Sequence, residues 1–300
     1  MAERADGGLT VERPAERDAV TSLDDDAEVP LRGGCSTEVV RRGATVRRTA
    51  SPWTPTVHAL LHHLRAAGVH RVPRPLGHDE QGREVLEFVE GTTAWWPWPE
   101  PLRSDAGLVA VARLVRELGD ALASFEEPPS AVWQGGPRWG EGLVVRHGDF
   151  GPWNTVWRDG ELVALIDWDT AEPAPPGWDA AQAAWAFVPL RPMTGYRAEA
   201  PLVDAEVEHR FGLWCRELAL EPARVFQLLE DQSDLERHRL VHLGGAGVEP
   251  FAAFLARGDL DELDAEGRWR AEHRDRLVAA AEAVVARRPD GDASGPCRST

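Results

Sequence analysis

A short polar loop holds the residues of this chain whose types and spacing are best suited to chemistry. Asp149 is followed five positions later by Asn154, and Asp167 follows after a further thirteen residues. Two carboxylates and one carboxamide provide oxygen ligands, and such a set can hold a hydroxyl group and Mg²⁺ together. Asn154 is the only asparagine in the sequence. An ordinary polar hairpin is the competing interpretation of these three residues.

Short apolar segments flank this loop and predict how it is held. Residues 143–145 precede the loop, and residues 162–166 follow a turn at 158–160. The pattern predicts a strand, the loop, a hairpin turn and a second strand that leads into Asp167. We therefore expect the three polar side chains at one end of a small β element.

The composition favours a globular chain of one large domain or two smaller ones. Three hundred residues, 43% of them hydrophobic, suffice for a substantial core. The net charge of −17 argues against nucleic acid as a partner and mildly favours a cationic small molecule, although acidic tails carry much of this charge. All 33 basic residues are arginine, and none is lysine.

The cysteines and the apolar runs bear on the cellular location. The three cysteines, at positions 35, 215 and 297, show neither a CxxC motif nor paired spacing. We therefore expect no disulfide framework and no zinc site, and a cytoplasmic protein. The sequence shows no signal-peptide pattern, and no apolar run approaches the roughly 20 residues that span a bilayer, so no membrane partner is expected. The oligomeric state is left open.

The predicted elements divide the chain near residue 91. Residues 1–27 and 289–300 are expected to be flexible tails, the first of them acidic. Residues 28–91 predict an N-terminal nucleotide-binding lobe with two antiparallel strands, a helix from Pro55 to Gly68 and a further strand at 84–89. The predicted helices of a C-terminal catalytic and substrate lobe, residues 92–288, lie at 104–125, 178–187, 203–220, 222–231, 234–243 and 262–287. The predicted fold class is α+β and two-lobed, with a small antiparallel sheet and a mostly helical second lobe.

Within this order of elements, two motifs point to a known family. His147-Gly148-Asp149 with Asn154, followed by Ile166-Asp167-Trp168-Asp169, resembles the aminoglycoside phosphotransferase family of protein-kinase-like small-molecule kinases. The likeness extends over roughly residues 30–260. It implies transfer of the terminal phosphate of ATP or GTP, with Mg²⁺, to a hydroxyl group of a small, cationic or amine-bearing molecule, either an aminoglycoside or a metabolite.

The resemblance also implies a role for each polar residue of the loop. Asp149 would be the catalytic base for the acceptor hydroxyl, while Asn154 and Asp167 would bind Mg²⁺. We expect His147 to brace the loop, and Asp179 to tie the start of a helix to it. Asp169 is a candidate contact of metal or substrate, and equally a carboxylate that meets only solvent.

The nucleotide is expected between the two lobes. The backbone of Glu87, Phe88 and Val89 is suited to hydrogen bonding with an adenine edge. Gly33 and Gly34 would let backbone N–H groups approach the phosphates, although a plain hairpin turn explains the two glycines nearly as well.

Two residues of the family pattern are missing. In the absence of lysine, Arg47 or Arg48 stands on the phosphate-anchoring strand, and strand alternation favours Arg48 facing inward. No carboxylate occurs from Pro55 to Arg71, and His58 stands near the place where the family has a glutamate. These absences favour the alternative of a non-catalytic pseudokinase that binds a nucleotide or another ligand.

Overall fold

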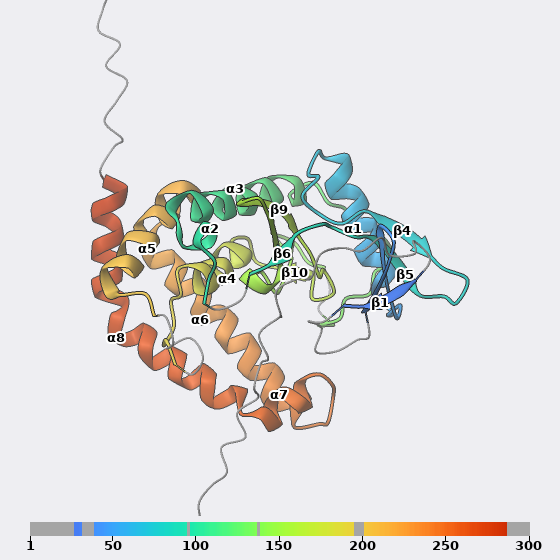
Figure 1. Cartoon of the computed structure of the whole chain (residues 1–300). Helices are drawn as coiled ribbons and strands as arrows, with labels where there is room; N and C mark the ends of the chain where they lie inside the picture. The colour runs from blue at the N-terminus through green and yellow to red at the C-terminus, as the bar shows by residue number, and fades with distance from the viewer. Residues whose placement is uncertain (1–26, 32–38, 95–96, 137–138, 195–200, 287–300) are drawn as a thin grey trace, which may run out of the picture.

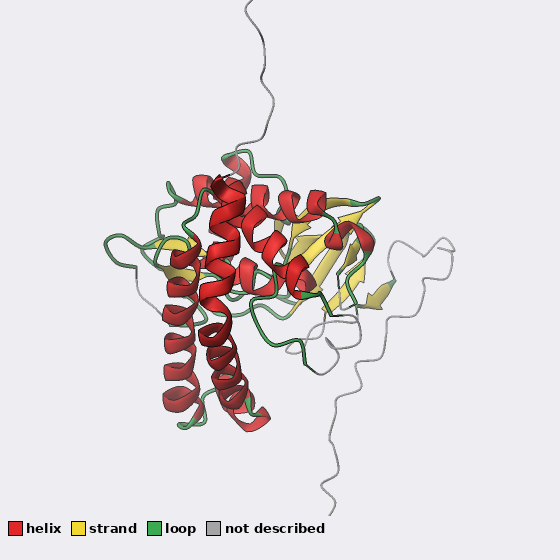
Figure 2. Cartoon of the chain, turned by 90° about the vertical axis from the view of Figure 1, so that its left-hand side faces the viewer, coloured by secondary structure: helices red, strands yellow, loops and turns green. Residues whose placement is uncertain are grey.

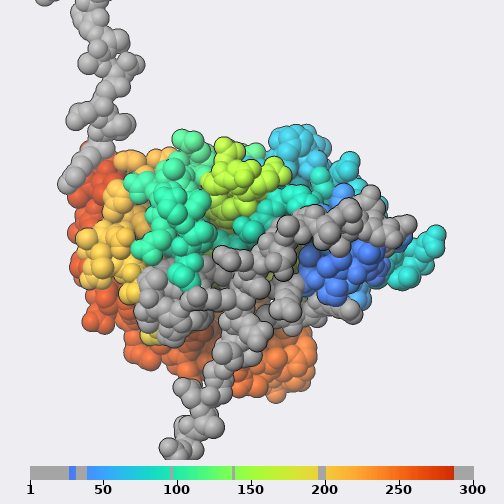
Figure 3. Space-filling model, viewed as in Figure 1, coloured from blue at the N-terminus to red at the C-terminus, as the bar shows by residue number. Residues whose placement is uncertain are grey.

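The chain has a strand-rich N-terminal part and a mostly helical C-terminal part (Figure 1). The computed structural model describes residues 27–31, 39–94, 97–136, 139–194 and 201–286. In the space-filling view, the blue and cyan atoms of the N-terminal part lie at one end of the molecule, and the yellow to red atoms of the C-terminal helices lie at the other end and along the bottom (Figure 3). The predicted α+β, two-lobed fold class is confirmed. The predicted tails lie, apart from residue 27, outside the described residues.

An antiparallel sheet with the strand order β1-β2-β3-β5-β4 forms the N-terminal part. Its strands are β1 (Glu28–Pro30), β2 (Val39–Arg42), β3 (Thr45–Arg48), β4 (Pro75–His78) and β5 (Glu84–Glu87). The register of β3 with β5 places Arg48 directly opposite Glu84. Residues that face each other across two strands share one side of a sheet. These two charged side chains therefore leave the sheet together.

One helix joins this sheet to the rest of the molecule. Helix α1 (Thr54–Ala66) contacts both β4 and the long helix α3 (Asp105–Leu122). Val57, Leu60 and Leu64 recur at helical spacing, and each is at most 1% exposed. The helix expected from Pro55 is thus present, and its apolar side forms part of the main core.

Helices build the C-terminal part. Besides α3, they are α2 (Glu100–Arg103), α4 (Trp178–Phe187), α5 (Asp204–Leu218), α6 (Pro222–Arg239), α7 (Phe251–Arg257) and α8 (Asp259–Ala286), with a π-helical turn at Leu240–Gly244. Helix α8 packs along α5 and α6, and Figure 2 shows the long helices in front, with strands visible on both sides of them. The prediction of two helices at 222–231 and 234–243 was wrong, because no glycine or proline interrupts α6 and it runs through the proposed break. No helix of the described part is both long and apolar enough to cross a membrane.

The predicted hairpin is present between α3 and α4. Strand β7 (Val144–Arg146) leads into the loop and pairs with β10 (Glu172–Ala174), while β6 (Thr92–Thr93), β8 (Thr155–Arg158) and β9 (Glu161–Leu165) form a separate sheet. The turn residues Asp159 and Gly160 have φ of 52° and 82°, as two-residue hairpins require. Asn154 directly precedes β8, and Asp167 lies two residues after β9, so both lie at the same end of the hairpin.

Candidate functional site

The loop after β7 is built around a buried histidine. His147 is fully buried, its Nδ1 accepts the backbone N–H of Asp149, and its Nε2 donates to the carbonyl of Ile166 at 3.0 Å. One ring nitrogen accepts while the other donates, which is the pattern of a neutral imidazole. The ring also packs edge-on against Trp168 at 4.6 Å between centroids. His147 thereby joins the loop to the segment that carries Asp167.

The first turns of α4 hold the same loop from the other side. Asp179 accepts the backbone N–H of His147 at 2.7 Å and of Gly148 at 3.3 Å. Gln182, one turn further along, donates to the carbonyl of Gly148 and accepts the N–H of Phe150. Gly148 has φ of +84°, and a Cβ there would lie 2.3 Å from the carbonyl oxygen of Thr170, so the close approach requires glycine.

Asp149 and Asn154 lie in direct contact. The Asn154 amide nitrogen donates to Oδ2 of Asp149 at 2.8 Å and to its backbone carbonyl at 2.9 Å. The indole of Trp153 donates to the same Oδ2 at 3.0 Å. Burial raises the pKa of the Asp149 carboxyl, and the nearby Asp167 carboxylate acts in the same direction. Both side-chain donors bind Oδ2, and the other carboxylate oxygen, Oδ1, takes part in neither of these hydrogen bonds.

Asp167 and Asp169 face the N-terminal lobe through one arginine. Asp167 has φ of +64°, an uncommon conformation for a residue with a side chain, and its carboxylate is half exposed. Nη1 of Arg48 lies 3.4 Å from Oδ1 of Asp167, and Nη2 lies 2.7 Å from Oδ1 of Asp169. Burial raises the pKa of Asp169 to about 6, with Arg48 opposing this shift and Asp167 adding to it. Arg48 is thus the cation that bridges the two lobes at this point.

The oxygen atoms at this end of the hairpin suit Mg²⁺. Both hydrogen bonds of the Asn154 amide nitrogen return to Asp149, which leaves the amide oxygen as an acceptor. The backbone N–H of Ile166 donates to the Asn154 carbonyl at 2.9 Å, so Asp167 follows immediately beside it. In the described ranges no cluster of three or more His, Cys, Asp or Glu side chains forms a ready metal cage. Mg²⁺ typically uses one or two protein carboxylates together with phosphates and water, and an amide and a carboxylate fit that use.

The residues expected to bind the nucleotide do not all lie where that role requires. Arg47 leaves β3 on the other side from Arg48, donating to Thr45 Oγ1 at 2.7 Å with its Nε 3.6 Å from Asp79. The N–H of Glu87 donates to the carbonyl of Arg74, and that of Phe88 to Ala44, so neither is available to an adenine edge. Of the three residues expected at the adenine edge, this leaves Val89. Gly33 and Gly34 lie outside the described residues.

Three residues around the site were not singled out from the sequence. Glu84 pairs with Arg48 from the neighbouring strand. Trp153 binds the carboxylate of Asp149, and Gln182 binds the loop backbone. Trp153 lies inside the recognised motif, and Gln182 follows Asp179 by three positions on one helix, so both could have been found from spacing.

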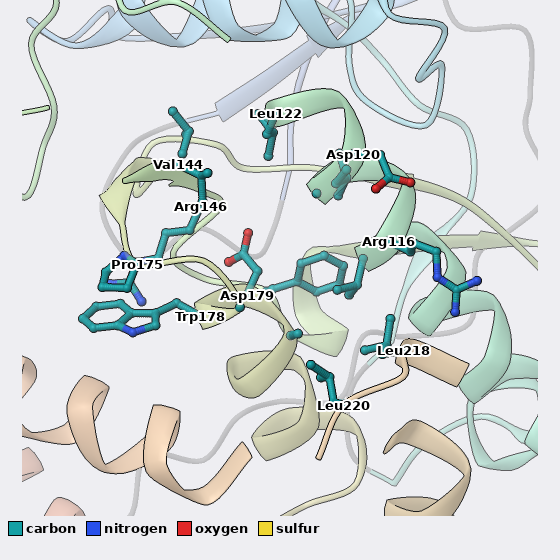
Figure 4. Close-up of a pocket in the computed structure, with 17 residues that line it drawn as sticks. Arg116, Asp120, Leu122, Val144, Arg146, Pro175, Trp178, Asp179, Leu218 and Leu220 are labelled. Carbon is teal, nitrogen blue, oxygen red and sulfur yellow. The ribbon is translucent and has the colours of Figure 1, made fainter. Parts of the chain in front are cut away.

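A cavity of about 210 Å³ lies behind the loop rather than at Asp149. It is lined by α3, β7 and the start of α4, with Asp179 and Arg146 among mostly apolar side chains (Figure 4). Arg146 lies over the ring of Trp178 and forms an ion pair with Glu172. None of Asp149, Asn154 and Asp167 lines this cavity, so it is separate from the candidate site.

This chain is similar to several known proteins. Residues 125–214 match the model of a family described as the phosphotransferase enzyme family. The chain is 40% identical over 192 residues to the trifolitoxin immunity protein of Rhizobium leguminosarum bv. trifolii, a match that covers 62% of this chain and 67% of that protein. A choline/ethanolamine kinase family protein from Mesorhizobium loti shares the fold, with a TM-score of 0.50 at 15% identity over 86% of this chain and 92% of that one. A thermostable mutant of an aminoglycoside phosphotransferase, in a ternary complex with ADP and hygromycin B, gives a TM-score of 0.46 at 16% identity over 85% and 94%.

Proposed function

The chain belongs to the phosphotransferase enzyme family, and on that premise we propose that it transfers the terminal phosphate of ATP or GTP to a hydroxyl group of a small, amine-bearing molecule. One observation carries the proposal. Asp149 and Asn154 are in contact at 2.8 Å, and Asp167 leaves the same end of the hairpin and faces Arg48. A base, two oxygen ligands and a cation are the parts that phosphoryl transfer requires.

In the proposed reaction, the acceptor oxygen forms a bond to the terminal phosphorus, and the bond from that phosphorus to the bridging oxygen breaks. The nucleoside diphosphate then leaves. Asp149 accepts the proton of the acceptor hydroxyl on Oδ1, since Trp153 and Asn154 already occupy Oδ2. The raised pKa of Asp149 makes it a stronger base than an exposed aspartate.

The other residues of the site would orient the phosphates and neutralise their charge. Asn154 and Asp167 would hold Mg²⁺, which when bound offsets the negative charge of the phosphates. Arg48 supplies a second positive charge, and its planar group can donate two parallel hydrogen bonds to one phosphate. Asp169 is half-buried and already bound to Arg48, so we assign it to positioning that arginine rather than to the acceptor.

Two observations bear on the molecule that this chain acts on: the net charge of the chain and the name of a relative. A net charge of −17 favours a cationic molecule. The 40% identical relative is named as an immunity protein against trifolitoxin, and this identity favours resistance to a toxin as a second candidate role. Expression of the wild type and of Asp149→Asn in a toxin-sensitive bacterium tests whether resistance depends on phosphoryl transfer. Protection by the wild type alone links resistance to phosphoryl transfer, while equal protection by both proteins excludes that link.

Nucleotide binding provides the first test. We expect MgATP or MgGTP to raise the melting temperature of the wild type, because a ligand at 100 times its Kd adds about 2.7 kcal/mol to the free energy of unfolding. A screen of amines and amino sugars for nucleotide consumption then identifies the acceptor. No stabilisation by either nucleotide, together with no consumption for any acceptor, contradicts the proposal.

Three variants assign the roles. Asp149→Asn should lower kcat about 10²- to 10⁴-fold, the range of a lost general base. Asp167→Ala should weaken the Mg²⁺ dependence of nucleotide binding. Asp159→Asn is the matched control, since this exposed aspartate lies in the turn at the far end of the same hairpin. Equal activity of all three variants would contradict the assignment.

The non-catalytic alternative has its own support. Arg48 already neutralises Asp167 and Asp169, as a cation without catalytic use would. A pseudokinase binds the nucleotide, and its slow background hydrolysis is the same in the wild type and in Asp167→Ala. A higher rate in the wild type favours the enzyme.

A further inference from the structure

Arg48 is held by carboxylates on three sides. Its Nε forms an ion pair with Oε2 of Glu84, while Nη1 and Nη2 face Asp167 and Asp169 at 3.4 and 2.7 Å. The guanidinium group is planar and its five donors are fixed in direction. A contact at Nε on one edge therefore determines where the two terminal nitrogens point. Glu84 occupies that edge, and the terminal nitrogens are aimed at the segment proposed to hold Mg²⁺.

Glu84 is itself fixed by its place in the sheet. It lies directly opposite Arg48 in the β3–β5 register and is 1% exposed. Although burial raises the pKa of its carboxyl, the hydrogen bond from His58 and the charge of Arg48 bring that pKa below its ordinary value. Glu84 is therefore ionised at neutral pH, and its buried charge needs both partners.

The second oxygen of Glu84 binds helix α1. Nε2 of His58 lies 2.8 Å from Oε1 of Glu84, and the imidazole is mostly buried. No carboxylate occurs anywhere in α1. The helix thus reaches the arginine through an imidazole and a strand carboxylate, instead of presenting a carboxylate of its own.

We propose that Glu84 and His58 are positioning residues that aim Arg48 at the phosphates of the bound nucleotide. This inference rests on the proposed function, because it requires a nucleotide in the cleft. In this arrangement the sheet supplies the negative partner of the phosphate-binding cation. Helix α1 contributes only a hydrogen-bond donor, which keeps the Glu84 carboxylate turned toward Arg48.

The arrangement predicts a phosphate-specific defect. Loss of Glu84 leaves unchanged the backbone at Val89, where the adenine edge is expected, and frees Arg48 to turn toward Asp167 and Asp169 alone. Binding of ATP should then weaken, while binding of adenosine, which has no phosphate, should not. A residue needed only for folding would weaken both ligands or neither.

The test measures the Kd of MgATP and of adenosine by competition against a fluorescent ATP analogue, or of MgGTP and guanosine if the wild type binds only those. We expect Glu84→Gln to weaken MgATP roughly 10- to 100-fold, the effect of losing a hydrogen bond to a charged group, and adenosine less than twofold. Glu84→Asp should recover part of the loss. Glu28→Gln is the control, because Glu28 pairs with Arg83 in the same sheet but is more exposed and does not contact Arg48.

Two substitutions at His58 test the proposed positioning role without depending on the folding of the Glu84 variants. His58→Phe keeps a ring and removes the donor, and should weaken MgATP roughly 3- to 10-fold. His58→Gln keeps an N–H donor and should bind like the wild type. Equal losses for MgATP and adenosine, or no loss in Glu84→Gln and His58→Phe, overturn the inference alone. A wild type that binds no nucleotide overturns the proposed function as well.

Discussion

Replacing Asp179 by asparagine removes one negative charge and keeps the shape of the side chain. The carboxylate accepts the N–H groups of His147 and Gly148, and it lies in the first turn of α4. An amide accepts one of these donors and turns its own NH₂ group toward the other. Hydrogen bonds to a charged group contribute about 1.5–3 kcal/mol each, and an anion at a helix N-terminus about 0.3–1 kcal/mol. One lost bond, one weakened bond and the lost helix interaction together give about 3 kcal/mol.

This loss is large enough to measure by calorimetry. A domain of this size loses about 2–4 °C of melting temperature per kcal/mol, so Asp179→Asn should melt about 6–12 °C below the wild type. Amide hydrogen exchange in the loop 147–154 should also quicken more than in α8, because the missing bonds hold only that loop.

The control for this variant is Asp204→Asn. Asp204 occupies the first turn of α5, but its side chain is 76% exposed and its partner is Arg276 at 2.9 Å. An exposed pair contributes less than about 1 kcal/mol. If Asp179→Asn melts within about 2 °C of the wild type, or no lower than this control, the loop is not held by α4 and the reasoning fails.

Three further predictions concern other parts of the molecule. Gly119→Ala should raise the free energy of unfolding by about 0.5–1 kcal/mol, because the added Cβ would meet no atom within 4 Å. Gly107→Ala in the same helix should lower the free energy of unfolding, because its Cβ would lie 1.7 Å from a carbonyl oxygen. Urea unfolding of both variants checks the pair, and changes of the same sign would contradict it. Glu172→Gln should lose about 3–5 kcal/mol at pH 7, since it leaves two arginines facing each other in the interior. Although burial raises the pKa of Glu172, those arginines bring it below 4.5. The difference in the free energy of unfolding between variant and wild type should therefore shrink as the pH falls through this lowered pKa. A difference that does not depend on pH would be evidence against the ion pairs. Burial raises the pKa of Cys215 to about 12, so iodoacetamide at pH 8 should modify it only in denaturant, as peptide mass mapping will show; rapid labelling of the native protein would contradict its burial.

Local patterns predicted most of the fold, and pairings between distant segments did not follow from them. The alternation in β2 and β3 and the helical spacing in α1 are readable because each pattern spans a few consecutive residues. Strand β4 contains Pro75 and Gly77, and β10 contains Pro173, which are residues that disfavour strands. Strand β4 nevertheless pairs with β5, and β10 pairs with β7. The partner of a strand cannot be recognised from the sequence of that strand alone.

The candidate site divides in the same way. Asp149 and Asn154 lie within one loop, so the local pattern predicted that both reach one end of a small β element, where the structure shows them in contact. Glu84 is 36 residues from Arg48, and its importance depends on the strand register. The absence of a carboxylate in α1 was visible from the sequence, while the strand that supplies one instead was not. Gly33 and Gly34 remain predictions.

The hairpin turn has a practical consequence for engineering. Asp159 and Gly160 are exposed, and they lie at the end of the hairpin opposite Asn154 and Asp167. Four residues of strand separate the two ends by about 13 Å at roughly 3.3 Å per residue. A peptide tag or a circular-permutation breakpoint placed between Asp159 and Gly160 would therefore leave the polar end of the hairpin intact and give a handle for attaching reporters to the working protein.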